Sequence, residues 1–131
     1  MRLLLDTHIA LWAIADDPRL TANARAIIED RDNSIAISAA TIWEIAIKRG
    51  LSRKGANAMP ISGNAALNYF RAAGYEILAI TAAHAAAAEN LPPLHTDPFD
   101  RLLVAQAVTE PLRLVTHDAQ LARYGETVML M

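Results

Sequence analysis

Two aspartates, Asp97 and Asp100, stand three residues apart in the stretch HTDPFDRLLVAQA, directly ahead of a strongly apolar run. If Asp97 is the N-cap of a helix, Pro98 falls at the first helical position, where a missing N–H costs nothing. Asp100 then falls at the end of the most apolar stripe of that helix, where an unpaired carboxylate is costly to bury. That stripe holds Leu103, Val104, Ala107 and Val108. We therefore expect Asp97 to cap the helix and Asp100 to need a cation.

Three further acids follow short apolar runs that are typical of buried strands. Asp6 comes directly after the run at residues 3–5, and Asp118 comes two residues after the run at 112–116. Glu44 stands near the start of the helix predicted after the run at 35–38. In parallel sheets, ligands bind outside the carboxyl ends of the strands. The sequence therefore predicts that Asp6, Glu44, Asp100 and Asp118 meet at one edge of a sheet.

Each of these acids also has a simpler interpretation when it is taken alone. Asp6 and Asp118 would cap the helices that follow them, and Glu44 would pair with Lys48 one turn along. Together, however, the carboxylates repel one another, by roughly 3 kcal/mol for two unit charges about 5 Å apart at an effective dielectric of about 20. A divalent metal ion removes that conflict, and oxygen ligands suit Mg²⁺ or Mn²⁺. The predicted chemistry is metal-assisted hydrolysis of a phosphodiester bond.

The elements that must position these acids alternate along the chain. Strands are predicted at residues 3–5, 35–38, 76–80, 112–116 and 127–130. Helices are predicted at residues 8–15, 21–30, 39–49, 64–73, 81–90, 98–110 and 119–124, with Gly50 ending the third of them and a loop at 51–63. This alternation predicts an α/β fold: a three-layer sandwich with a mainly parallel, about five-stranded sheet flanked by helices. We expect a single domain over residues 1–131.

Composition narrows the functional classes further. The chain has 131 residues, a net charge of −2 and 53% hydrophobic residues, which excludes a disordered chain and a generally basic nucleic-acid coat. It has no cysteine, which excludes a disulfide framework, a thiolate metal site and a cysteine nucleophile. No uncharged apolar run reaches the roughly 20 residues of a membrane span. We expect a soluble, cytoplasmic protein without a membrane partner.

Other chemistry-bearing residues receive weaker predictions. The basic cluster Lys48, Arg49, Arg53 and Lys54 would contact substrate phosphates or simply form a solvated helix end, and the two readings are equally good. Arg101 is expected to pair with a nearby acid. The histidines lack the i, i+4 spacing of zinc helices, so no histidine metal site is predicted; they are His8, His84, His95 and His117. The aromatic residues Trp12, Trp43, Tyr69 and Phe70 are expected in the core or in an interface.

Four segments, in this order, resemble a PIN domain of the VapC type, the toxin ribonuclease of VapBC toxin-antitoxin systems. They are LLLDTH, SAATIWEIAIKRG, HTDPFDRLLVAQA and LVTHD, and the resemblance covers essentially the whole chain. It implies that Asp6, Glu44, Asp100 and Asp118 form the catalytic, metal-binding quartet. Thr116 would support the site by a hydrogen bond, and Asp97 belongs only to relatives with the DPFDR form.

The same resemblance implies Mg²⁺ or Mn²⁺ as cofactor, endonucleolytic cleavage of RNA, a homodimer, and a cognate antitoxin protein whose tail covers the active-site groove. Two alternatives remain beside this nuclease. An aspartate-dependent phosphatase would use Asp6 after the first strand, but the expected second acid is replaced by His8. A non-catalytic binding or scaffold module would use the acids only as caps and surface pairs. Transfer, ribosomal and messenger RNA are all open as substrates.

Overall fold

The five strands found in the described residues lie in one sheet. The computed structural model describes residues 1–51 and 59–131. The strands are β1 (Arg2–Leu5), β2 (Ser34–Ser38), β3 (Glu76–Leu78), β4 (Arg113–Thr116) and β5 (Val128–Leu130). The α-helices are α1 (Thr7–Ala15), α2 (Ala22–Glu29), α3 (Ala39–Leu51), α4 (Gly63–Ala72), α5 (Ala82–Ala87) and α6 (Pro98–Thr109), and two 3₁₀ helices are η1 (Ala88–Asn90) and η2 (Leu121–Tyr124). Among the described helices, none is long and apolar enough to cross a membrane.

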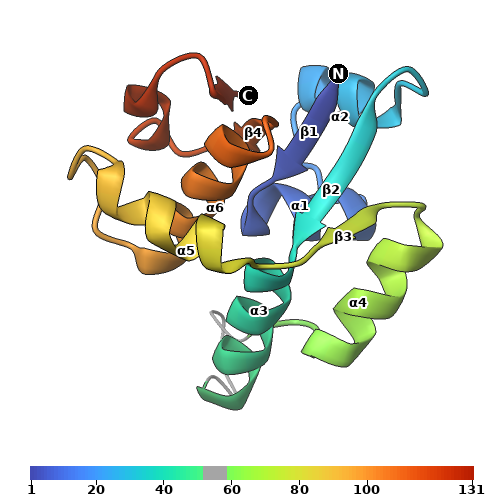
Figure 1. The fold of residues 1–131 in the computed structure, drawn as a ribbon. Helices are drawn as coiled ribbons and strands as arrows, with labels where there is room; N and C mark the ends of the chain where they lie inside the picture. Colours follow the sequence, from blue (N-terminus) through green and yellow to red (C-terminus); the bar gives the residue numbers. More distant parts are fainter. Residues whose placement is uncertain (52–58) are drawn as a thin grey trace.

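The strand order is β3-β2-β1-β4-β5, and every neighbouring pair is parallel. After β1 the chain moves outward through β2 to β3, then returns to the other side of β1 to form β4 and β5 (Figure 1). The strand order thus reverses between β1 and β4. Crevices at such a reversal, outside the carboxyl ends of the strands, are where ligands bind in open α/β sheets. The predicted parallel sheet is confirmed.

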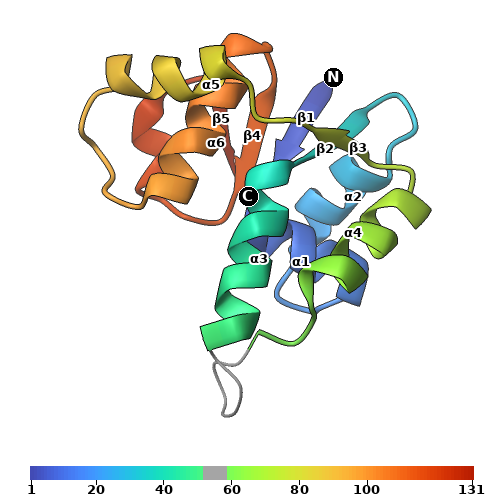
Figure 2. The same ribbon diagram turned by 60° about the horizontal axis from the view of Figure 1, so that its bottom comes forward.

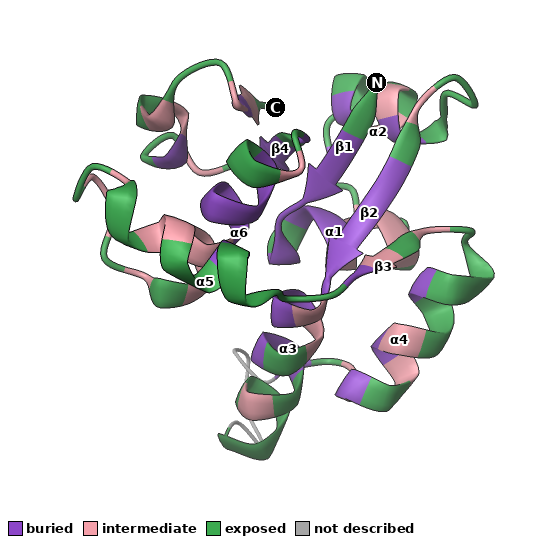
Figure 3. Cartoon of the chain, viewed as in Figure 1, coloured by how far each residue is buried: buried purple, intermediate pink, exposed green. Residues whose placement is uncertain are grey.

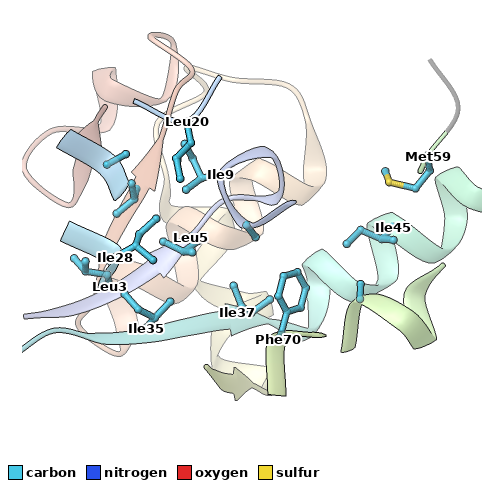
Figure 4. Close-up of a cluster of buried hydrophobic side chains, with 14 residues drawn as sticks. Leu3, Leu5, Ile9, Leu20, Ile28, Ile35, Ile37, Ile45, Met59 and Phe70 are labelled. Carbon is cyan, nitrogen blue, oxygen red and sulfur yellow. The ribbon is translucent and has the colours of Figure 1, made fainter. Parts of the chain in front are cut away.

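Helices cover both faces of the sheet because the buried strands are apolar on both faces. Leu3 and Leu5 of β1 join one buried cluster with Ile9 of α1 and Phe70 of α4 (Figure 4). Leu4 points the other way and packs in a second cluster with α6 and the 3₁₀ helix η2. Figure 2 shows α5 and α6 on the opposite side of the sheet from α2 and α4. Figure 3 shows the resulting burial along the central strands.

Two glycines behave differently from the sequence prediction. Gly50 does not end its helix, because α3 continues through it to Leu51; a glycine near a helix end costs only about 1 kcal/mol relative to alanine. Gly63 is the first residue of α4 rather than part of the preceding loop, and Ser62 is the N-cap. A Cβ at Gly63 would lie 3.1 Å from Cβ of Ala46, so glycine allows α4 to start close against α3. Residues 52–58 of the predicted loop lie outside the described part of the chain.

Smaller differences concern element ends and surface aromatics. β3 stops at Leu78 instead of residue 80, and the helix predicted at 119–124 is the short 3₁₀ helix η2. The helix predicted at 81–90 divides into α5 and η1. Phe70 is in the core as expected, whereas Trp43 and Tyr69 are each 58% exposed, so for these two rings an interface is the part of the prediction that stays open.

The adjacent residues Phe70 and Tyr69 provide a matched test of the α4 packing. Phe70→Ala should lower the free energy of unfolding by about 3–5 kcal/mol because it empties a fully buried site. Tyr69→Ala should change it by less than about 0.5 kcal/mol, since that ring is mostly exposed. Urea unfolding followed by circular dichroism measures both. Equal losses in the two variants would contradict the described orientation of α4.

Candidate active site

Asp6 lies directly beyond β1, where the strand order reverses. Its backbone N–H donates to Val115 O of β4 at 3.0 Å, which extends the β1–β4 pairing by one residue. Its carboxylate is buried, with Oδ1 accepting from Ile9 N at 2.9 Å and Oδ2 accepting from the Thr116 hydroxyl. Burial raises the pKa of Asp6 above its usual value, against the lowering effect of these two hydrogen bonds. Asp6 is therefore a helix cap, as the simpler interpretation held, and also part of a buried polar group.

Thr116 connects Asp6 to Asp118. While its hydroxyl donates to Asp6, the same oxygen accepts from Asp118 N at 3.0 Å. The Asp118 carboxylate is 41% exposed, and its Oδ1 accepts from Gln120 N at 2.9 Å. The hydrogen bond expected from Thr116 is present, and it fixes the turn that carries Asp118.

Asp97 and Asp100 have the separate positions that the sequence predicted. Oδ1 of Asp97 accepts from Phe99 N at 2.9 Å and from Asp100 N at 3.1 Å, so Asp97 is the N-cap of α6. The side chain of Asp100 is 24% exposed. Burial raises the pKa of Asp100 to about 6, against the lowering effect of a hydrogen bond with His95, and the charges of Asp97 and Asp6 raise it further.

His95, for which the sequence predicted no metal-binding role, lies beside Asp100 and Asp118. His95 Nε2 lies 2.8 Å from Oδ2 of Asp100 and 3.8 Å from Oδ2 of Asp118. One ligand atom from each of these three residues lies within 4.8 Å of the others, an arrangement that could hold a metal ion. Spacing along the chain gave no sign of this, because His95 precedes α6 in a loop and meets Asp118 from a distant segment.

Glu44 is the predicted acid whose negative charge is paired with a lysine, Lys48. It is buried in α3, where Oε1 accepts from the Thr7 hydroxyl at 2.6 Å. Oε2 forms an ion pair with Lys48 Nζ at 2.6 Å, so the predicted i, i+4 pair exists. It is not the surface pair of the simpler interpretation, since the Glu44 side chain is only 6% exposed. Thr7, which donates to Glu44, directly follows Asp6 in the chain, and the charge of Glu44 is a minor cause of the raised pKa of Asp6.

The predicted basic cluster is only partly described. Lys48 is engaged by Glu44, and Arg49 donates to Met59 O at 2.7 Å. Arg53 and Lys54 lie outside the described residues.

The expected pairing of Arg101 with an acid is wrong. The Arg101 guanidinium donates instead to backbone carbonyls of Ala88 at 3.0 Å, Pro92 at 3.3 Å and His95 at 3.4 Å. A guanidinium has five N–H donors, so it can hold several turns of a loop at once. Arg101 therefore secures the segment that carries His95.

The buried residues of α6 also differ from the apolar stripe that the sequence predicted. Leu103, Val104 and Ala107 are buried as expected, but Val108 is 52% exposed. Gln106, which is not part of the predicted stripe, is fully buried, and its Nε2 donates to Ala79 O at 3.3 Å. The α5 helix, which packs on α6, creates this second buried side.

Comparison with known families identifies the fold. The family model of the PIN domain matches residues 3–127. The chain belongs to the PIN domain family.

This PIN domain is 34% identical over 122 residues to a protein named Ribonuclease VapC22 from Mycobacterium tuberculosis, covering 91% of this chain and 88% of the relative. Among solved structures it resembles a chain of VapBC2 from Rickettsia felis bound to a DNA fragment from their promoter, with a TM-score of 0.70 and 23% identity over 100% of this chain and 98% of that one. It also resembles a chain of a toxin-antitoxin complex from Klebsiella pneumoniae, with a TM-score of 0.64 and 18% identity over 97% and 95% of the two chains. These two structures support the fold.

The cap assignment of Asp97 predicts unequal effects of two substitutions. Asp97→Ser should leave the free energy of unfolding nearly unchanged because serine also caps helices, whereas Asp97→Ala should lower it by about 1 kcal/mol. Urea unfolding of the two variants at neutral pH in EDTA measures the difference. Equal stability of the serine and alanine variants would show that the hydrogen bonds to Phe99 N and Asp100 N contribute nothing.

The raised pKa of Asp100 predicts a specific dependence of stability on pH. Its pKa is 3.8 in the unfolded reference and about 6 in the folded protein, so folding takes up a proton between these values. The stability that this protonation contributes is present below pH 3.8 and is lost as the pH rises through 6. In EDTA, the wild type should therefore lose stability relative to Asp100→Asn between pH 4.5 and pH 7. A difference between the two proteins that stays constant over this interval would contradict the prediction.

Proposed function

We propose that this PIN domain is a metal-dependent endoribonuclease that acts as the toxin of a toxin-antitoxin pair. The main support is the arrangement at the strand reversal, where acids from three separate segments meet: Asp100 and Asp118 lie on either side of His95, and Thr116 joins Asp118 to Asp6. Membership of the PIN family and the 34% identity to a ribonuclease support RNA as the substrate.

The donor atoms fit a divalent metal ion. Ligands on opposite sides of one Mg²⁺ are about 4.2 Å apart, and the candidate atoms of Asp100, Asp118 and His95 lie within 4.8 Å of one another. Asp100 and Asp118 would hold the ion, with the buried carboxylate of Asp6 supplying negative charge and Glu44, which is paired with Lys48, contributing less. Mg²⁺ or Mn²⁺ suits such carboxylates. When bound, the ion would polarise the scissile phosphate and lower the pKa of an attacking water.

The protein's own contribution is to hold these carboxylates in place before substrate arrives. Asp97 fixes the start of α6 and with it the position of Asp100. Thr116 joins Asp6 to the turn of Asp118, and Thr7 together with Lys48 orients Glu44. Side chains held in this way need no reorganisation when charge develops on the phosphate.

An antitoxin partner is proposed because the solved structures that resemble this chain include toxin-antitoxin complexes. Free toxin would cleave cellular RNA, so the protein should inhibit growth when it is produced alone. Production together with its cognate antitoxin should relieve that inhibition.

The phosphatase alternative is disfavoured by the surroundings of Asp6. The position two residues after Asp6, where such a phosphatase would carry its second acid, holds His8, and the Asp6 carboxylate is buried and already accepts two hydrogen bonds. The scaffold alternative explains Asp97 well but gives no reason for Asp100 to lie half-buried beside Asp118 and His95.

Substitution of single acids tests the nuclease. Protein stripped with EDTA should not cut a mixture of structured RNAs, and cutting should return with Mg²⁺ or Mn²⁺. Asp6→Asn and Asp100→Asn should each lower the cleavage rate by at least about a hundredfold, because they remove charge needed at the transition state. Asp97→Ser should retain most of the activity, since serine keeps the cap.

Asp32→Asn is the matched control, because Asp32 is an exposed acid ahead of β2 at the opposite edge of the sheet. Gel analysis of the cleavage products and circular dichroism of each variant give rate and folding together. Undiminished cleavage by folded Asp6→Asn or Asp100→Asn protein would refute the assigned site.

A further inference from the structure

Arg101 of α6 fixes the backbone of the segment that carries His95. Arg101, the residue after Asp100, donates to the carbonyl of His95 itself and to those of Pro92 and Ala88 in the preceding segment. The hydroxyl of Tyr124 donates to Pro92 O at 3.0 Å and thereby adds a second attachment to the same segment. Asp100 and Arg101 thus act as a pair: one contributes a carboxylate to the site and the other fixes the backbone beside it.

The orientation of the His95 ring is set by Gln120. Nδ1 of His95 lies 3.0 Å from Oε1 of Gln120, and an amide oxygen can only accept, so Nδ1 must carry the hydrogen. Nε2 then faces the carboxylates of Asp100 and Asp118, at 2.8 Å and 3.8 Å. Histidines that bind metals characteristically donate the other ring N–H to a carbonyl or carboxylate, which directs the free nitrogen at the ion. The His95 side chain, 12% exposed, has this orientation, and its Nε2 hydrogen-bonds to Oδ2 of Asp100, so an ion bound there would replace the proton between these two atoms.

We propose that Nε2 of His95 is a direct ligand of the catalytic metal ion, together with the carboxylates of Asp100 and Asp118. This proposal rests on the metal-dependent nuclease proposed above and changes its donor set. The sequence predicted oxygen ligands alone, whereas this site offers one nitrogen and two oxygens.

A nitrogen ligand changes which ion the site prefers. Mg²⁺ strongly favours oxygen ligands and keeps much of its water, whereas first-row transition ions accept imidazole more readily. The site should therefore bind Mn²⁺ more tightly than Mg²⁺, and His95 should account for a large part of that preference. Gln120 is a positioning residue in this arrangement, since it acts on the ion only through the His95 ring.

The most direct test detects the bond between nitrogen and metal without measuring activity. The protein of residues 1–131 is stripped with EDTA and loaded with one equivalent of Mn²⁺, and pulsed electron paramagnetic resonance records ¹⁴N coupling to the ion. Wild type should show the coupling of a directly bound imidazole. His95→Gln should lose it. His8→Gln and His117→Gln should retain it, because these exposed histidines, one on α1 and one beside Asp118, are not in the proposed donor set.

Calorimetric titration of the same proteins supplies affinities. His95→Gln should weaken Mn²⁺ binding by at least about tenfold and lower the ratio of Mn²⁺ to Mg²⁺ affinity by a similar factor. Gln120→Leu, which leaves His95 in place but removes its acceptor, should weaken Mn²⁺ binding by about tenfold. The wild-type resonance spectrum alone shows whether a nitrogen binds Mn²⁺ directly, so the test does not depend on every variant folding.

The outcomes separate this proposal from the function on which it rests. Tight Mn²⁺ binding without ¹⁴N coupling, and unchanged by His95→Gln, would overturn His95 as a ligand and leave an oxygen-only nuclease site intact. Coupling that disappears in His8→Gln or His117→Gln instead would assign the nitrogen to a different ring and also overturn it. Failure of wild type to bind Mn²⁺ or Mg²⁺ at all would contradict both the ligand and the metal-dependent function.

Discussion

The parallel pairing of β1 with β4 is the constraint on which the rest of the site depends. These two strands meet where the strand order reverses, so the residues beyond their carboxyl ends enter the same crevice. The N–H of Asp6 extends that pairing to Val115, and the Thr116 hydroxyl then joins the carboxylate of Asp6 to the backbone of Asp118. A register shift of one residue would turn Thr116 to the other face and break this connection.

Gathering carboxylates at one edge opposes folding, and the chain limits this cost locally. Three of the four acids are held by hydrogen bonds or an ion pair: Asp6 by the start of α1 and Thr116, Glu44 by Thr7 and Lys48, and Asp100 by His95. The fourth, Asp118, is partly exposed and accepts from Gln120 N in its own turn. The raised pKa values of Asp6 and Asp100 show that repulsion and desolvation are not fully relieved. A divalent cation bound at this edge would offset that cost, and binding to the folded state would stabilise it by mass action.

Part of the fold and of the site could be predicted from the sequence because it depends on residues that are close together in the chain. The roles of Asp97 and Asp100 follow from helix-cap geometry, which needs only neighbouring residues, and the strands follow from short apolar runs. The place of His95 in the site was not predicted, because hydrogen bonds with Arg101 and Gln120 position it beside the acids. These contacts join distant parts of the chain, and no spacing rule describes them. The burial of Gln106 and exposure of Val108 were missed for a related reason, since neighbouring helices decide which sides of α6 are covered.

The proposed function requires that the acids beyond β1 and β4 and at the start of α6 form one cation site. Anomalous X-ray scattering from crystals grown with Mn²⁺ tests this most directly, because the signal locates the ion independently of any model of its ligands. We expect an anomalous peak between the carboxylates of Asp100 and Asp118, on the side of the crevice nearest Asp6. A crevice without a peak at saturating Mn²⁺, or an ion bound only elsewhere on the surface, would contradict it.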